Sequence, residues 1–101
     1  MRIIVLFNLK EGVDIGEYEE WAKTRDIPTA SALSSVTSFT VHKATGLFGS
    51  DDPSPYEYFE IIDITGMDAF VADVSDPEFQ AMAAPFQDYA DGPQFILTED
   101  L

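Results

Sequence analysis

Residues 3–9 form an apolar run that is hydrophobic on both faces of a strand. The run, Ile-Ile-Val-Leu-Phe-Asn-Leu, is rich in β-branched and aromatic residues, and a turn signal at 10–12 bounds it. Because successive side chains of a strand point to opposite faces, this strand needs apolar cover on both sides. One layer of helices covers only one face. The chain must therefore bury the other face against a further layer.

The rest of the chain alternates between helical and strand patterns. A cap at Asp14 begins an amphipathic helix, and Pro28 is predicted to stop or kink it near 26–27, because proline disfavours helical backbone in the preceding residue. A second helix, capped at 75–78 and kinked at Pro85, carries its own apolar stripe. The remaining predicted elements are strands at 36–43 and 56–64, a loop at 46–55, a short helical turn after Thr65-Gly66, a helix end at Gly92-Pro93 and a strand at 94–98.

This order predicts an α+β, ferredoxin-like βαββαβ domain that spans residues 1–101. Its four strands form an antiparallel sheet with the helices on one face. Since apolar residues divide between both faces of several strands, the second face is expected to pack against a second copy of the same sheet. The predicted assembly is a two-fold homodimer joined through the sheet face.

The charge of the chain excludes several classes of partner. Nineteen acidic residues and five basic ones give a net charge of −14, and every basic residue lies within the first 43 positions. Such a polyanion is repelled by nucleic acid and by anionic membrane surfaces, so neither is an expected partner. There is no cysteine and no apolar run approaching about 18 residues. We expect a cytoplasmic domain.

Several segments carry a resemblance to a known family. Residues 21–28 (Trp-Ala-Lys-Thr-Arg-Asp-Ile-Pro), followed by Leu33, Val36, Phe39 and Val41, resemble the first helix and second strand of the dimeric α+β barrel superfamily. Within it the chain resembles the RedY-like, or HapK, family, which is associated with prodiginine-type pigment pathways. Segments 56–61, 67–70 and 76–79 extend the likeness over nearly the whole chain.

The resemblance implies a pocket between helices and sheet. The superfamily includes cofactor-independent monooxygenases, cyclases, isomerases and binding proteins, so the fold narrows the function little. EthD-like relatives commonly carry a histidine two positions before the proline that ends the first helix, and this chain has Asp26 there. An acid/base role assigned through that histidine cannot be transferred unchanged.

Two neighbouring charged residues are candidates for chemistry at the end of the first helix. The spacing of Ile15, Tyr18, Ala22 and Arg25 places a cation on the apolar stripe. Arg25 either pairs with an acid such as Glu60 or Asp63, or anchors a ligand carboxylate, enolate or carbonyl. Asp26 either bonds local amides near the proline, or acts as a general base if it is partly desolvated.

The remaining candidates are the single histidine and a set of aromatic residues. His42 is either an exposed or core-edge strand residue, or a proton-transfer group if it points into the pocket; a haem ligand at this position is disfavoured. The aromatic residues either pack as core or form a box around a flat ligand. They are Tyr18, Trp21, Tyr58, Phe86 and Tyr89.

Three functions stay open at this point. The favoured one is a small-molecule-binding protein that holds a planar aromatic or pyrrole-like metabolite in secondary metabolism of the prodiginine or polyketide type. The second is a cofactor-independent monooxygenase or cyclase that uses Asp26 or His42, and the third is an interaction module without catalysis. Nucleotide, zinc-peptidase, hydrolase and calcium motifs are missing, and Asp51-Asp52 is too short for a metal cage, so no cofactor or metal is expected.

Overall fold

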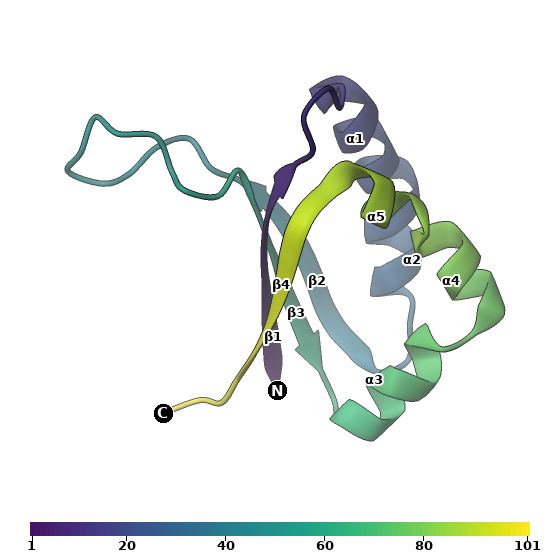
Figure 1. Ribbon diagram of the computed structural model, residues 1–101. Coiled ribbons are helices and arrows are strands. Elements are labelled where there is room, and N and C mark those ends of the chain that lie inside the picture. The colour runs from purple at the N-terminus through teal and green to yellow at the C-terminus, as the bar shows by residue number, and fades with distance from the viewer.

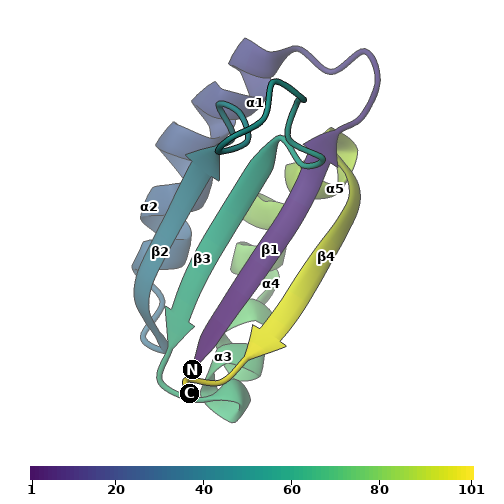
Figure 2. The same cartoon turned by 90° about the vertical axis from the view of Figure 1, so that its left-hand side faces the viewer.

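Four antiparallel strands form one sheet in the order β2-β3-β1-β4, and the helices lie against one face of it (Figures 1 and 2). The computed structural model describes residues 1–101. The predicted ferredoxin-like arrangement is confirmed. The elements in chain order are β1 (Arg2–Leu9), α1 (Ile15–Trp21), the π-helical segment η1 (Ala22–Asp26), α2 (Ile27–Ser31), β2 (Val36–Lys43), β3 (Tyr58–Ile64), α3 (Met67–Val74), α4 (Pro77–Ala83), α5 (Pro85–Tyr89) and β4 (Ala90–Thr98).

Strand β1 lies inside the sheet, paired on one side with β3 and on the other with β4. Its Ile3, Val5 and Phe7 are buried beneath the helices, which makes this face of the sheet the floor of the core. Ile4 and Leu6 point to the opposite, helix-free face and are only half-buried. Both faces of β1 are apolar, as predicted. In the single chain the helices cover one of them and leave the other uncovered.

The first helical segment continues past the point where the proline was predicted to stop or kink it. Pro28 is the second residue of α2, and the helical path extends to Ser31. The chain accommodates the proline through the π-helical segment η1, in which the amide of Ile27 donates to the carbonyl of Ala22, five residues earlier. Since proline has no amide hydrogen and its ring crowds the carbonyl four residues back, a wider turn before it relieves both problems.

The last strand starts earlier than its sequence predicts. The helix was expected to run to Gly92-Pro93, but α5 ends at Tyr89 and β4 begins at Ala90. Gly92 has a φ of 55°, and the pairing of β1 with β4 shifts register between Leu6 and Asn8. Gly92 and Pro93 therefore lie at an irregularity within β4 and do not end a helix. Proline is tolerated at such an irregularity.

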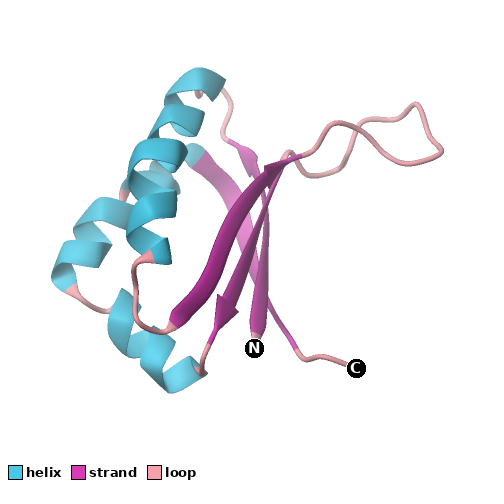
Figure 3. Ribbon diagram, turned by 180° about the vertical axis from the view of Figure 1, so that it is seen from behind, coloured by secondary structure: helices cyan, strands magenta, loops and turns pink.

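Two segments, after β3 and between β2 and β3, complete the fold. The helical turn expected after Gly66 is a full helix, α3, of eight residues. The segment between β2 and β3 projects away from the helices, past the helix-free side of the sheet (Figures 1 and 3), and the Phe48 side chain within it is completely exposed. None of the helices combines the length and the apolar character that crossing a membrane requires.

Candidate functional site

A cavity of about 280 Å³ lies between the helices and the covered face of the sheet. Its wall is mostly hydrophobic and includes five phenylalanines, contributed by β2, α3, α4, α5 and β4. They are Phe39, Phe70, Phe79, Phe86 and Phe95. The polar lining residues are Asp26, Glu60 and Gln87, and no lysine, arginine or histidine reaches the wall. The cavity is therefore an apolar chamber whose only charged groups are acids.

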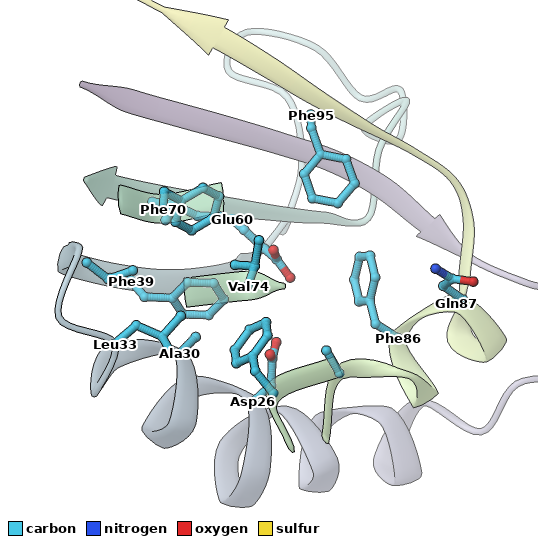
Figure 4. Close-up of a pocket in the computed structure, with 14 residues that line it drawn as sticks. Asp26, Ala30, Leu33, Phe39, Glu60, Phe70, Val74, Phe86, Gln87 and Phe95 are labelled. Carbon is cyan, nitrogen blue, oxygen red and sulfur yellow. The ribbon is translucent and has the colours of Figure 1, made fainter. Parts of the chain in front are cut away.

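Two carboxyl groups point toward one another across this chamber (Figure 4). Asp26 is the last residue of η1, and its exposed fraction is 7%. Glu60 lies in the middle of β3 between Val5 of β1 and Val41 of β2, and its exposed fraction is 4%. One acid thus comes from the helical layer and the other from the sheet.

Burial dominates the electrostatics of this pair. Neither acid takes part in either of the two ion pairs of the chain, and Oε2 of Glu60 has no hydrogen-bond partner. Desolvation raises the pKa of Asp26 from 3.8 to about 6. Desolvation, and secondly the charge of Asp26, raises the pKa of Glu60 from 4.5 to about 8. Near pH 7 the pair therefore holds about one proton, mainly on Glu60, in the manner of coupled acids.

The buried hydroxyl of Tyr18 lies close to both acids. It has no hydrogen-bond partner, and its pKa is raised first by burial and then by the charges of Glu60 and Asp26. The hydroxyl is therefore a neutral group near neutral pH. Of the two acids, Glu60 presents an oxygen, Oε2, without a hydrogen-bond partner in the chain, and a ligand or water in the cavity can supply the missing bond.

The structure moves Arg25 out of the predicted stripe. Arg25 is exposed, whereas the buried positions of this helical segment are Tyr18, Ala22, Asp26 and Ala30. The predicted spacing assumed a regular helix of about 3.6 residues per turn. The π-helical turn at 22–26 holds more residues per turn, so the residue after Arg25 takes the inward position. Arg25 therefore pairs with neither Glu60 nor Asp63 and does not line the cavity.

His42 lies on the opposite side of the sheet from the cavity. It pairs in register with Phe59 on the helix-free face, is exposed, and its Nε2 is 2.9 Å from Oγ1 of Thr40. The alternation of β2 turns Phe39 and Val41 toward the helices and His42 away from them. The predicted role of this histidine as an acid/base group in the pocket therefore does not fit the structure.

The predicted aromatic residues come together, but mainly as a cluster packed on itself. Tyr18 contacts Tyr58, Tyr89 and Trp21, with ring centroids 4.9, 5.7 and 6.2 Å apart. Of the five candidates only Phe86 lines the cavity that holds Asp26 and Glu60. Tyr18 and Tyr58 border a separate cavity of about 120 Å³ together with Lys23 and Lys43.

Glu60 is the site residue that the sequence analysis did not select. Its signal is visible in the sequence: on β3 it shares a face with the buried Tyr58, Ile62 and Ile64. A carboxylate among apolar residues of one strand face marks either a buried functional group or an ion pair. In the sequence analysis Glu60 appears only as one of two possible ion-pair partners for Arg25. No group of three or more histidine, aspartate or glutamate residues is placed to hold a metal ion.

Comparisons with solved structures place this fold among known relatives. HapK from Hahella chejuensis is 29% identical, with a TM-score of 0.75, and the alignment covers 100% of this chain and 93% of that protein. A dimeric ferredoxin-like protein of unknown function from Thermobifida fusca is 20% identical, with a TM-score of 0.71 and coverages of 94% and 85%. SnoaB, a cofactor-independent oxygenase from Streptomyces nogalater, solved in a mutant form, is 15% identical, with a TM-score of 0.72 and coverages of 99% and 93%.

Sequence comparison identifies the family. A search of curated proteins gives no significant match. The family model described as REDY-like protein HapK matches residues 1–101, which is the whole sequence. The protein therefore belongs to the HapK family of REDY-like proteins.

Proposed function

We propose that this protein binds a small planar metabolite, aromatic or pyrrole-like, in the cavity between its helices and its sheet. The observation that carries the proposal is an apolar chamber with two facing, buried carboxyl groups, neither of them in an ion pair, of which Glu60 has an oxygen without a hydrogen-bond partner. Ligand sites are typically concave and mostly apolar, with a few convergent polar groups. Membership of the HapK family supports a role in secondary metabolism of the prodiginine or polyketide type.

The size and wall of the cavity fit a flat ligand. Its volume of about 280 Å³ lies near the lower end of ligand sites, roughly 300 Å³. Phenylalanines from both layers offer ring faces and edges, which favour contact with another aromatic ring. The third possibility, an interaction module whose pocket is filled by its own side chains, loses support because the cavity is open space.

The same proposal includes a homodimer formed through the helix-free face of the sheet. That face carries half-buried Ile4, Leu6, Phe59 and Ile61, a row of apolar side chains in the centre of the sheet. The projecting segment with the exposed Phe48 lies on the same side, in reach of a second copy (Figure 3). The solved relative from Thermobifida fusca is described as dimeric, which supports a second copy as the cover.

An acid/base enzyme is a second candidate, because the two carboxyls differ in protonation near pH 7. Asp26 is the group available to accept a proton, and Glu60 the group that carries one. Electron-rich phenols and polyketide intermediates need little more than a base and a water-poor cavity for oxygenation or cyclisation. The likeness to the fold of SnoaB, a cofactor-independent oxygenase, is compatible with this candidate.

Filling the cavity should prevent binding of flat aromatic compounds. Ala83→Leu places a larger side chain in the cavity wall, while Ala81→Leu adds the same atoms to an exposed position of the same helix, α4. In a thermal-shift screen of heteroaromatic compounds, we expect stabilisation of the wild type and of Ala81→Leu, and its loss in Ala83→Leu. Equal stabilisation of both variants would place the bound compound elsewhere.

A charge on the helix-free face should separate the dimer. We expect light scattering at micromolar concentration to give the mass of a dimer for the wild type. Ile61→Lys should give a folded monomer, because lysine in the interface loses its hydration. Val71→Lys, at an exposed position of α3, is the control that should remain a dimer. A monomeric wild type contradicts the proposed assembly.

Turnover distinguishes the enzyme from a passive binder. Purified protein without added metal should accelerate oxygen uptake by electron-rich phenols if Asp26 acts as a base. Asp26→Asn should then lower kcat by roughly 10²-fold or more, the usual contribution of general acid–base catalysis. Binding without any turnover above the background rate counts against the enzyme and leaves the binding function in place.

The buried acids should make the protein less stable as pH rises. The pKa values of both acids are raised on folding, so the folded state binds more protons than the unfolded state. The stability that this proton binding provides is fully present below pH 4 and is lost as pH rises toward 8. Between pH 5 and 8 we expect the free energy of unfolding of both the wild type and Glu60→Gln to fall. The decrease should be larger in the wild type, by at least about 1 kcal/mol. This corresponds to roughly 4–8 °C in Tm.

The matched control for this measurement is Glu20→Gln, which removes an exposed carboxylate from α1. Its stability should follow the wild-type pH profile. If Glu60→Gln also follows the wild type, Glu60 is not buried as a proton-holding group, and the electrostatic description of the cavity is incorrect.

A further inference from the structure

We infer that the cavity selects ligands whose polar end is a nitrogen cation with N–H donors, such as an amidine or a protonated nitrogen heterocycle, seated between Asp26 and Glu60. The inference rests on the proposed binding function and deepens it by naming the ligand class. One of the two alternatives that the sequence left open for Arg25 was an anchor for an anionic ligand group, and the structure places Arg25 outside the cavity. The starting point is the set of groups that face the cavity from each element.

Every charge that faces the cavity has the same sign. Asp26 faces it from η1 and Glu60 from β3, whereas the hydroxyl-bearing Tyr18 of α1 borders the smaller cavity. The only polar side chain of α5 that lines the cavity is that of Gln87, which is neutral. Lys23 and Lys43 border the smaller cavity, where Lys43 is already paired with Glu19 at 3.0 Å, and Arg25, the chain neighbour of Asp26, is exposed.

These groups reject an anion and accept a cation. A ligand carboxylate would enter a desolvated chamber with no cation and would meet one ionised acid, which adds repulsion to the cost of desolvation. A nitrogen cation would replace water lost from both carboxyls with charge-assisted hydrogen bonds. Oε2 of Glu60 accepts no hydrogen bond within the chain, so a hydrogen bond from the ligand to this atom breaks no existing one.

The direction in which the acids face explains why the cation should be flat and carry more than one N–H. The carboxyls approach from opposite layers, one from the helices and one from the sheet (Figure 4). A planar group with N–H bonds diverging from one end can donate to both at once. Its ring can meanwhile contact the phenylalanines of the wall, whose faces also attract a cation.

Three isosteric probes test the ligand class on the unmodified protein. Benzamidine, benzamide and benzoate share one ring and one planar head group, and differ in charge from cation to neutral to anion. By isothermal titration calorimetry at pH 7 we expect benzamidine to bind at least tenfold more tightly than benzamide, and benzoate not to bind. Benzamide cannot form the charge-assisted hydrogen bonds that benzamidine forms, and the loss of one such bond weakens binding by at least tenfold.

The titration also has a readout that simple apolar binding lacks. Because a cation favours the ionised form of both acids, benzamidine should displace part of the proton held by the pair at pH 7. Titrations in two buffers of different ionisation enthalpy measure that release, which should lie between zero and one proton per site. Affinity for benzamidine should rise by roughly tenfold from pH 5 to pH 8.5, as Asp26 and then Glu60 ionise.

Neutral variants identify the acids responsible. Asp26→Asn and Glu60→Gln should each weaken benzamidine binding by about tenfold while leaving benzamide within about threefold, and Glu60→Gln should abolish proton release. Glu20→Gln removes the same charge from the exposed surface and should change neither value. Both cavity variants replace a buried ionisable group with a neutral amide of nearly the same size, and the probe series on the wild type tests the ligand class even if one of them fails to fold.

Two results would overturn the inference. If benzamide or benzoate binds as tightly as benzamidine, the cavity binds ligands but does not select a nitrogen cation, so the proposed function stands without this refinement. If none of the three probes binds at millimolar concentration, selection of a cation by these acids is also rejected. The screen with the Ala83→Leu variant then decides separately whether the cavity binds flat ligands at all.

Discussion

The burial of strand β1 on its helix-covered face is the constraint on which the rest of the structure depends. Ile3, Val5 and Phe7 form the floor of the core, and the neighbouring strand β3 adds Tyr58 and Ile62 in register with Phe7 and Ile3. Because this floor is apolar, any polar group placed on it loses its water. Glu60 lies on that floor in register with Val5, and its raised pKa is a direct consequence of this position.

The π-helical turn determines which charged residue reaches the cavity. Asp26 and Arg25 are neighbours of opposite charge, and a change of one position around the helix would exchange them. The widened turn before Pro28 turns Asp26 inward and leaves Arg25 in solvent. π-helical segments occur frequently at functional sites. Here the segment adds the acid Asp26 to the cavity wall. The negative charge of the cavity then determines which ligands can bind in it.

The two faces of the sheet have separate roles. The covered face holds the cavity and its acids, whereas the helix-free face holds His42, the apolar row of Ile4, Leu6 and Ile61, and the ion pair of Arg2 with Asp63. A dimer formed through the second face would leave the cavity within each subunit. Binding and assembly can then be altered by different substitutions, because no side chain of a strand reaches both faces.

The sequence by itself determined the order of elements, the bounds of β2 at 36–43 and the need for cover on both sides of β1, because these follow from the local period of apolar residues. It also brought forward Asp26 as a candidate. Only the tertiary structure decided the sign of the cavity. The inward turn of Asp26 depends on a widened helical turn, and the isolation of Glu60 depends on the absence of any cation from all the elements that line the cavity, which no local pattern records.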